Sequence, residues 1–286
     1  MKEQYRKYFF IALLVFINML VWGLYISQKE NKVLEVAFLD IGQGDAILIT
    51  APNGAQMLID GGRDASVLGE LGRSMGFFDR YINIVLATHP DQDHVGGLPL
   101  VFDKYQVGNF IDSVADSGTN SYQALLQKAK EENANYYLGL RGMIIVLDKG
   151  SGVYLHVLYP EPDEFEIEET NELSIITKLV YGDTSFMLTG DAGKMPETLL
   201  YATDKEYLRS SVLKAGHHGS RTSSGASFVR MVAPTYAVIS AGRDNSYGHP
   251  HKEVIEVFEK EGIEILSTAT TGTIKFESNG VDVWVK

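Results

Sequence analysis

The feature that most constrains this chain is an apolar run near its N-terminus. Residues 8–26 read YFFIALLVFINMLVWGLYI, with no charged residue and only Asn18 as a strongly polar interruption. At about 1.5 Å rise per residue, a helix of this length nearly spans a hydrocarbon core of roughly 30 Å. The run has no polar face that would suit a helix packed on the surface of a globular domain. It therefore predicts a separate transmembrane helix.

Charged residues before this run predict its orientation. Lys2, Arg6 and Lys7 precede it, and the positive-inside rule keeps such an end in the cytoplasm. A cleaved signal peptide is the alternative, but it needs a shorter apolar run and a small-residue cleavage site, whereas this run ends in SQKE. We expect a cytoplasmic N-terminus and single-pass membrane anchor over residues 1–30, followed by an extracellular domain over residues 31–286.

The composition of residues 31–286 limits what the domain can bind. It contains 21 Lys and Arg against 35 Asp and Glu, a formal net charge of −14. Such a domain does not grip polyanions by bulk electrostatics, which weakens a nucleic-acid interpretation without excluding it. The chain has no cysteine, so disulfides, thiolate metal sites and a cysteine nucleophile are ruled out. No low-complexity linker divides residues 33–286, which predicts one domain.

Short β-rich runs dominate this domain, with helical patterns between them. Apolar or alternating runs bounded by Gly, Pro, Asn or Asp predict strands at 34–39, 45–50, 56–60, 82–88, 144–147, 153–159, 174–181, 185–189, 211–215, 237–240, 264–267, 272–277 and 281–285. Helical periodicity predicts helices at 65–75, 98–105, 121–133, 196–203, 226–232 and 252–261.

A coarse repeat indicates how these elements are arranged. Residues 45–60 and 174–191 each read as a strand, a tight Gly-containing turn and a second strand that ends at an Asp. Two such units predict two similar β-rich halves that pack sheet on sheet, with helices outside. An active site is then expected at the strand ends, where the loops that carry the Asp residues emerge.

One loop concentrates side chains that bind metals. His89, Asp91, Asp93 and His94 follow an apolar strand in the sequence THPDQDHVGG. His89 and Asp91 are spaced to reach one ion, while Asp93 and His94 turn toward another. Ligands held in one short loop are ordered before the ion binds, which lowers the cost of binding. A polar loop with incidental histidines is the alternative, and the density of ligand types argues against it.

Further candidate residues stand at the ends of other predicted strands. Asp191 closes one strand with a carboxylate able to bridge two cations, and His217 and His218 follow another strand. Asp60 ends a third strand, and His249 lies in a Gly/Pro turn before the last helix. The plainer alternatives are that Asp60 ties its own loop and that His249 caps the helix.

These motifs, in this order, resemble the metallo-β-lactamase superfamily. More narrowly, the chain is similar to the C-terminal metallo-hydrolase domain of the ComEC DNA-uptake proteins and its stand-alone relatives. The resemblance covers about residues 34–275 and rests on LDIGQGDA at 39–46, IDGG at 59–62, the loop at 89–94, NELS at 171–174, LTGD at 188–191, GHHGS at 216–220, YGHP at 247–250 and TG at 271–272. It implies an α+β fold, a four-layer αββα sandwich with a two-metal site between its sheets.

The resemblance also assigns metal ligands by position. It implies that His89 and Asp91 bind one ion, that Asp93 and His94 bind the other, and that Asp191 bridges the two. One histidine of the adjacent pair at 217–218 would complete the second site. His217, at the strand end, is the expected ligand, with His218 as the alternative.

Two departures from the family pattern affect the first ion. The superfamily usually has His where Asp91 stands, and it has a further His before the bridging Asp, where this chain offers only His156 in a predicted strand. Asn171, water or substrate would then complete the coordination. Carboxylate in place of imidazole shifts preference toward harder ions, so the expected cofactors are two divalent ions, either Zn²⁺ or Mn²⁺.

The expected chemistry is hydrolysis by a water that the two ions activate. Asp93 or Asp60 would orient that water or a ligand histidine, and His249 would protonate the leaving group. The remaining candidates would hold a phosphate or carboxylate of the substrate, unless they are merely solvated charges or loop residues: Lys214, Ser220 and Arg221.

The leading hypothesis is a membrane-anchored, extracytoplasmic phosphodiesterase, and the resemblance to ComEC implies a nuclease. An envelope phosphodiester, such as a teichoic-acid or phosphocholine ester, fits the anchor equally well. A β-lactam hydrolase is less favoured because of Asp91 and the GHHGS motif. A non-catalytic binding module is opposed by the joint presence of six ligand-type residues. The sequence indicates a small or polymeric phosphodiester as the partner, with nucleic acid among the options, and names no protein partner.

Overall fold

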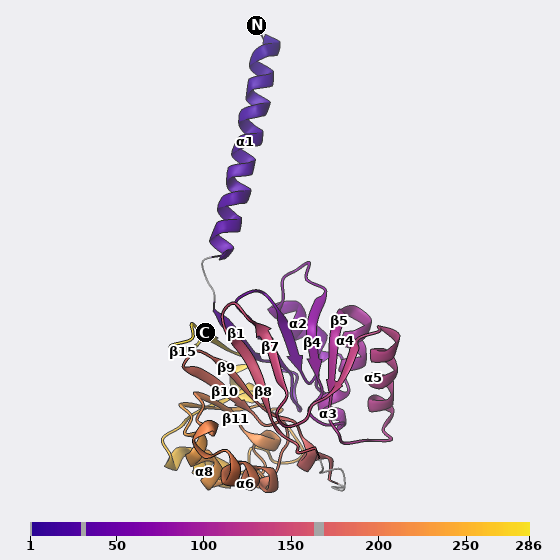
Figure 1. The fold of residues 1–286 in the computed structure, drawn as a ribbon, viewed down its shortest axis with the longest axis vertical. Coiled ribbons are helices and arrows are strands. Elements are labelled where there is room, and N and C mark those ends of the chain that lie inside the picture. The colour runs from indigo at the N-terminus through magenta and orange to yellow at the C-terminus, as the bar shows by residue number, and fades with distance from the viewer. Residues whose placement is uncertain (1, 30–32, 163–168) are drawn as a thin grey trace. The chain divides into compact units, whose positions relative to one another are not determined.

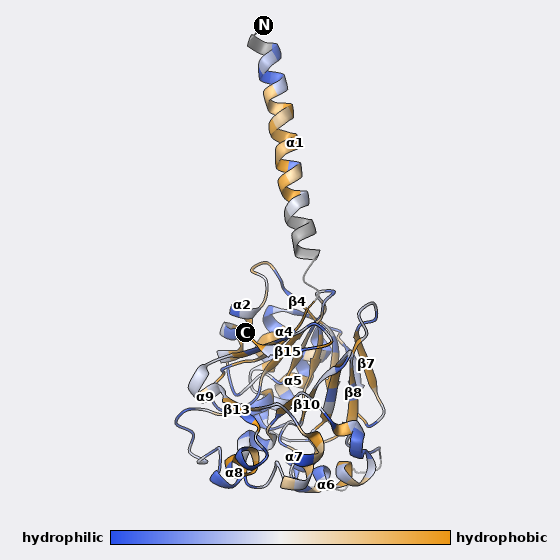
Figure 2. Cartoon of the chain, turned by 90° about the vertical axis from the view of Figure 1, so that its left-hand side faces the viewer, coloured by the Kyte–Doolittle hydropathy of each residue, from blue (hydrophilic) through white to orange (hydrophobic). Residues whose placement is uncertain are grey.

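The computed structural model describes residues 2–29, 33–162 and 169–286. The chain divides into two compact units, Met1–Val33 and Leu34–Lys286. The first unit is a single helix, α1 (Lys2–Lys29). Its stretch Gln4–Gly23 is long and apolar enough to cross a membrane, and none of it is buried. Figure 2 shows apolar residues along most of the described part of this helix.

The second unit contains two mixed β-sheets. The first sheet has eight strands in the order β15-β14-β1-β2-β3-β4-β5-β6. Their bounds are β1 Leu34–Phe38, β2 Ile47–Thr50, β3 Gln56–Ile59, β4 Tyr81–Leu86, β5 Gln106–Asp112, β6 Asn135–Leu138, β14 Ile274–Ser278 and β15 Val283–Val285. Neighbours from β15 to β3 run antiparallel, and those from β3 to β6 run parallel.

The second sheet has seven strands in the order β13-β12-β11-β10-β9-β8-β7. Their bounds are β7 Ile144–Asp148, β8 Val153–Tyr159, β9 Ile176–Tyr181, β10 Thr184–Leu188, β11 Val212–Lys214, β12 Tyr236–Ile239 and β13 Glu264–Ser267. The strands from β7 to β10 run antiparallel and those from β10 to β13 run parallel. The antiparallel hairpin followed by parallel strands repeats the plan of the first sheet, as the two similar hairpins predict.

Helices cover the outer face of each sheet. The helices are α2 Ser66–Ser74, α3 Gln92–Val95, α4 Leu98–Lys104, α5 Asn120–Glu131, α6 Lys194–Thr203, α7 Ala226–Val232, α8 Lys252–Lys260 and α9 Thr268–Thr271, with 3₁₀ turns η1 Thr170–Leu173, η2 Lys205–Leu208 and η3 Gly216–Gly219. Figure 1 shows α2, α4 and α5 beside β4 and β5, with α6 and α8 against the other sheet.

Three buried apolar clusters hold these layers together. One cluster lies between the sheets and includes Phe38, Phe186 and Phe276, whose rings meet edge to face. A second packs α2, α4 and α5 on the first sheet, and a third packs α6, α7 and α8 on the second sheet. The domain is therefore the four-layer αββα sandwich that the sequence predicts, and non-directional apolar burial supplies most of its stability.

Two strands of the first sheet lie where the sequence indicates no element. β6 is an edge strand whose four side chains are all exposed, so it has no apolar alternation to detect. β5 includes Gly108 and Asn109 in its middle, which interrupt an otherwise apolar run. Both strands continue the parallel part of the sheet beside β4.

A buried carboxylate at the end of β5 gives a prediction about stability and pH. Asp112 accepts hydrogen bonds from Tyr122, Tyr136 and the Ser113 amide, yet burial raises its pKa to about 6. When folding raises the pKa of a carboxyl group, the resulting loss of stability is complete above the folded-state pKa. It disappears below the pKa that the group has in the unfolded chain. Asp112→Asn should therefore raise the free energy of unfolding at pH 7.5 by up to about 3 kcal/mol.

Unfolding of the full chain in detergent, followed between pH 4 and pH 8, checks this prediction. The advantage of the Asn variant should shrink as pH falls through 6. Asp244, an exposed carboxylate that does not act on Asp112, provides the matched control, and Asp244→Asn should leave the profile unchanged. A difference between wild type and Asp112→Asn that does not vary with pH would contradict the assignment.

Candidate metal centre

The candidate ligands converge on the carboxyl ends of strands from both sheets. Asp60 directly follows β3, and His89 lies just beyond β4 in the eight-stranded sheet. Asp191 and His218 come after β10 and β11 in the seven-stranded sheet. Because parallel strands end at a common edge, residues far apart in the sequence meet there.

Asp60 fixes the orientation of His94. Its carboxylate accepts hydrogen bonds from the Thr88 amide and hydroxyl at 2.8 and 2.7 Å, and it lies 2.8 Å from Nδ1 of His94. Nδ1 therefore carries the donated proton, and Nε2 of His94 points at Asp191, 3.3 Å from Oδ2. A carboxylate behind a histidine in this way is a frequent support for a metal ligand.

Thr88 fixes the orientation of His89 in a similar way. The hydroxyl of Thr88 donates its only proton to Asp60, so it accepts a hydrogen bond from Nδ1 of His89 at 3.0 Å. Nε2 of His89 is left with a lone pair and has no hydrogen-bond partner among the described residues. The two adjacent rings lie with their centroids 4.1 Å apart.

His218 is oriented from the second sheet. Its Nδ1 donates to the carbonyl oxygen of Ser240 at 2.9 Å. Its Nε2 then faces two carboxylates, 3.2 Å from Oδ2 of Asp191 and 3.5 Å from Oδ2 of Asp93. Two buried histidines, His94 from one half of the domain and His218 from the other, thus present Nε2 to the same carboxylate oxygen of Asp191.

Four of the buried residues form a tight cluster. One ligand atom from each of Asp45, His94, Asp191 and His218 lies within 4.8 Å of all the others. Asp45 was not among the residues predicted from the sequence, although it belongs to the LDIGQGDA motif. Its carboxylate lies 3.5 Å from Nδ1 of His218 and forms an ion pair with Lys214.

The chemistry of this cluster fits a divalent metal. Buried atoms without a hydrogen-bond partner in the described residues include Nε2 of His89, His94 and His218 and Oδ1 of Asp45 and Asp191. Orphaned polar atoms are costly inside a protein, and the cost disappears when they coordinate an ion. Imidazole nitrogens and carboxylate oxygens are the donors that Zn²⁺ and Mn²⁺ accept.

The first predicted site is more open than the second. Oδ2 of Asp91 lies 4.0 Å from Nε2 of His89, a separation that two ligands of one ion can span. The Asp91 side chain is two-fifths exposed, and its Oδ1 accepts a hydrogen bond from Thr170. Asn171, next to Thr170 in η1, has a buried Oδ1 without a partner among the described residues.

The geometry favours His218 over His217 at the second site. Nε2 of His217 lies 3.8 Å from Oδ2 of Asp191, and the side chain is partly exposed. Its Nδ1 meets the Thr222 hydroxyl at 3.3 Å, and that hydroxyl also donates to Ser220. Backbone φ angles of +44° at His217 and +54° at His218 direct the two rings into different positions.

Mutual electrostatics keep the cluster ionised. Burial opposes charge on every group here, but Asp191 and Asp60 outweigh it and hold the pKa of His94 well above its usual value. The pKa of His218 is likewise raised well above normal, chiefly by Asp191 acting against burial. In return, His218 and His94 overcome burial and keep the pKa of Asp191 well below normal. A metal ion therefore competes with protons for both imidazoles.

Lys214 lies beneath the cluster and not at its surface. Its side chain has no exposed area, and its ammonium donates to the carbonyl oxygen of Gly190 at 2.9 Å. It pairs with Asp45 and lies 3.6 Å from Oδ1 of Asp191. Burial opposes its charge, yet Asp45 and Asp191 raise its pKa. The ammonium thus neutralises the two carboxylates from below, out of reach of a substrate.

The other predicted residues surround the cluster unequally. The His249 ring lies 5.5 Å from His217 and stacks on Tyr247 at 5.6 Å, so it borders the site. Burial and the neighbouring His217 lower the pKa of His249 to about 4. Arg221 is exposed and turns toward Glu253 of α8, 3.9 Å away, so its side chain lies apart from the cluster.

His156 lies within β8, as the alternation of that run indicates. Its Nδ1 meets the hydroxyl of Tyr207 at 3.0 Å, and none of its described contacts is with the cluster.

Gly44 explains why the LDIGQGDA motif is glycine-rich. Its φ is +122°, and a Cβ there would lie 2.0 Å from the backbone oxygen of Asp93. The following amide, that of Asp45, donates to the same oxygen. The motif therefore packs directly on the metal-ligand loop and brings Asp45 to the cluster, a role unrelated to phosphate binding.

Comparison with known proteins agrees with this fold. Residues 39–142 match the metallo-β-lactamase superfamily. The domain has the metallo-β-lactamase fold. Its fold is shared with the metallo-β-lactamase fold protein YhfI from Bacillus subtilis, with a TM-score of 0.57 at 11% identity over 87% of this chain and all of that one.

Competence proteins are similar to this chain in sequence. ComE operon protein 3 of Bacillus subtilis (strain 168) is 31% identical over 271 residues, which cover 88% of this chain and 34% of that protein. Competence protein ComA of Neisseria gonorrhoeae is 29% identical over 257 residues, with the same two coverages of 88% and 34%. The chain therefore spans about a third of the length of these relatives. The expected resemblance to ComEC-like proteins is confirmed.

Proposed function

We propose that this chain is a membrane-anchored, metal-dependent phosphodiesterase whose metallo-β-lactamase domain lies outside the cytoplasm. The observation that carries the proposal is the pair of buried, unpartnered Nε2 atoms of His94 and His218 that face the carboxylate of Asp191, with the unpartnered Nε2 of His89 beside Asp91. Two divalent ions, Zn²⁺ or Mn²⁺, would be held by the 89–94 loop, Asp191 and His218, with Asp45 beside them. When bound, such a pair activates a water molecule and stabilises negative charge on phosphate oxygens.

The chain's own residues supply orientation and charge balance. Asp60 and Thr88 hold His94 and His89 in the tautomers that leave Nε2 free. Lys214 offsets the charge of the buried carboxylates. With its low pKa, His249 is neutral at pH 7. We therefore expect its neutral ring to donate a hydrogen bond to the leaving oxygen, in place of a charged imidazolium that transfers a proton.

Membrane placement follows from α1. The apolar stretch Gln4–Gly23 would span the bilayer, and the basic residues before it would stay in the cytoplasm. A reporter fused to the C-terminus should then be active only in the outer compartment. Activity of a cytoplasm-specific reporter at that position would contradict this orientation.

The competence relatives favour a nucleic-acid substrate, whereas the net charge of −14 in residues 31–286 favours a substrate held by the ions alone. A short envelope phosphodiester is therefore the second candidate. Both candidate substrates undergo the same reaction, the hydrolysis of a phosphodiester. They differ in the length of the substrate's phosphodiester backbone that the domain must bind.

The test uses the full chain in detergent. Elemental analysis should find about two divalent ions per chain, and Mn²⁺ or Zn²⁺ should support hydrolysis of bis-p-nitrophenyl phosphate. Single-stranded DNA and a poly(glycerol phosphate) polymer are then compared as substrates under the same conditions. Absence of both bound metal and turnover would overturn the proposal in favour of a binding module.

A further inference from the structure

The metallo-β-lactamase domain carries an exposed aromatic pair far from the metal centre. Phe77 and Phe78 lie in the loop between α2 and β4 and are 81% and 90% exposed, more than any other large apolar residue described in residues 34–286. Their rings meet edge to face, with centroids 4.9 Å apart. Two adjacent phenylalanines in water are unfavourable, which indicates that another apolar phase covers them.

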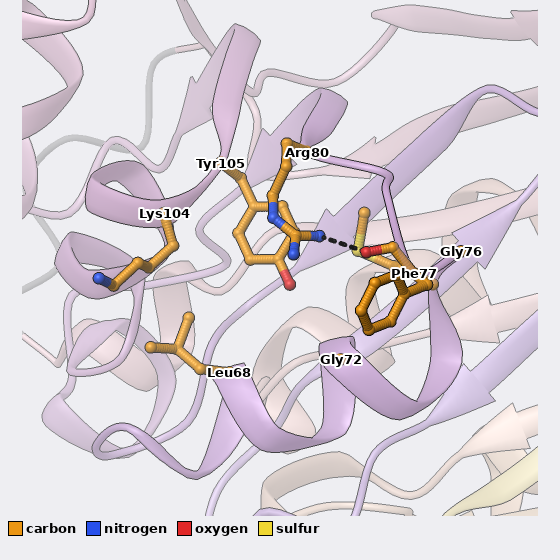
Figure 3. A pocket seen from close by; sticks show the side chains of 8 residues that line it. Leu68, Gly72, Gly76, Phe77, Arg80, Lys104 and Tyr105 are labelled. Carbon is orange, nitrogen blue, oxygen red and sulfur yellow. Dashed lines mark hydrogen bonds between the residues drawn. The ribbon is translucent and has the colours of Figure 1, made fainter.

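Two cationic side chains, Arg80 and Lys104, lie at the base of this pair, and Asp79 follows Phe78 with its carboxylate accepting a hydrogen bond from the Tyr81 amide. A cavity of about 390 Å³ under Phe77 is lined by Leu68, Met75, Arg80, Lys104 and Tyr105, among others. Figure 3 shows the Arg80 guanidinium over the Tyr105 ring, with its hydrogen bond to the Phe77 carbonyl oxygen. Neither Arg80 nor Lys104 has a carboxylate partner within the described part of the chain, although the domain is strongly acidic.

Strand directions place this loop relative to the chain's entry into the domain. β1 and β2 are antiparallel, β2 and β3 are antiparallel, and β3 and β4 are parallel. β1 and β4 therefore point the same way, so Leu34 at the start of β1 and Tyr81 at the start of β4 lie at one end of the sheet. The metal centre lies at the opposite end, beyond the carboxyl ends of β3 and β4.

We infer that Phe77 and Phe78 form a docking tip that inserts into the interface of an anionic phospholipid bilayer, where Arg80 and Lys104 pair with headgroup phosphates. The inference rests on the proposed anchor: only residues 30–33 separate α1 from β1 in the sequence, so an anchored α1 would tether the start of β1 to the membrane. Aromatic rings beside basic residues are the composition that interfacial segments use. Bulk charge would repel the domain from anionic lipid, so contact depends on this local patch.

Docking at the tip would keep the metal centre on the far side of the domain. The amino ends of β1 and β4 would then face the bilayer. The carboxyl ends of β3 and β4, with the candidate metal ligands, would face the aqueous phase. A second copy of the chain or another protein is the competing occupant, and the experiment separates it from lipid.

The absence of cysteine allows a clean test with single spin labels on the full chain. We would make three single-cysteine variants: Phe78→Cys, Leu14→Cys in α1 and Lys252→Cys in α8. Each variant is labelled with a nitroxide and inserted at one chain per phosphatidylglycerol nanodisc. Accessibility to oxygen and to a water-soluble nickel chelate then reports the surroundings of each label. Label 78 should favour oxygen over the chelate several-fold relative to label 252, and Phe77→Ser or Arg80→Gln with Lys104→Gln should reduce that preference.

Each outcome decides a separate point. If label 14 lies in lipid while label 78 is as accessible to the chelate as label 252, the docking tip is contradicted and the membrane anchor is still supported. If label 14 is also accessible to the chelate, the proposed membrane anchor is contradicted, and the docking tip that depends on it is contradicted too. If label 78 is shielded from both reagents, a protein covers the tip, which likewise overturns the inference.

Discussion

Replacing Asp191 by Asn is expected to lower phosphodiester hydrolysis by at least about 10³-fold, equivalent to about 4 kcal/mol of transition-state stabilisation. Oδ2 of Asp191 lies between Nε2 of His94 and of His218, at 3.3 and 3.2 Å, so one oxygen faces ligands from both halves of the domain. An amide has the same shape but no negative charge, so it binds a divalent ion weakly. Metal content should fall together with turnover.

Elemental analysis and bis-p-nitrophenyl phosphate turnover on the same preparations check this result. Asp183→Asn is the matched control, because it removes the same charge at an exposed hairpin of the same sheet. His156→Ala should also retain metal, since its ring contacts Tyr207 and not the cluster. Turnover of the Asp191 variant equal to that of the control would show that hydrolysis occurs elsewhere.

Replacing Lys214 by Met is expected to destabilise the metal-free protein by about 3–5 kcal/mol. The ammonium is fully buried, pairs with Asp45 and approaches Asp191. Methionine fills a similar volume, so the loss comes mainly from leaving carboxylates buried without their cation. Because a divalent ion supplies positive charge to the same carboxylates, saturating Mn²⁺ should recover part of the loss.

Thermal unfolding of the full chain, with chelator and then with Mn²⁺, measures both effects. Adding Asp45→Asn to the Lys214 variant should recover stability, because it removes the uncompensated charge. Lys178→Met provides a comparison: among the described residues, that ammonium donates to the backbone carbonyl oxygens of Tyr207 and Arg209 and has no carboxylate partner, so the cost should be smaller. Equal destabilisation by the two single variants would contradict a role for the charge pair.

The sequence predicts those parts of the fold that local pattern determines. Strands bounded by Gly, Pro, Asn or Asp and helices with apolar periodicity are found close to their expected positions, because turn chemistry and burial act within a few residues. β6 escapes prediction because an edge strand with exposed side chains has no alternation. The loop at 89–94 is recognisable because its ligands are consecutive.

Residues whose role depends on distant partners are harder to predict. Asp45 looks like one more turn residue, and only its contacts with Lys214 and His218 bring it into the centre. Lys214 reads as a possible substrate contact, yet β11 is buried on both faces and holds its ammonium underneath. The choice between His217 and His218 depends on two positive φ angles, which residue identity alone does not indicate.

The distribution of ligands between the two halves sets the order of folding and metal loading. Asp45 and the 89–94 loop belong to the first sheet, whereas Asp191 and His218 come from the second, so the cluster exists only after the sheets have packed together. A chain emerging from a ribosome or a translocation channel presents the ligands of the first sheet before those of the second. Metal would therefore be acquired late, from the ion pool of the compartment in which the domain completes its folding, and that pool would decide which ion the protein carries.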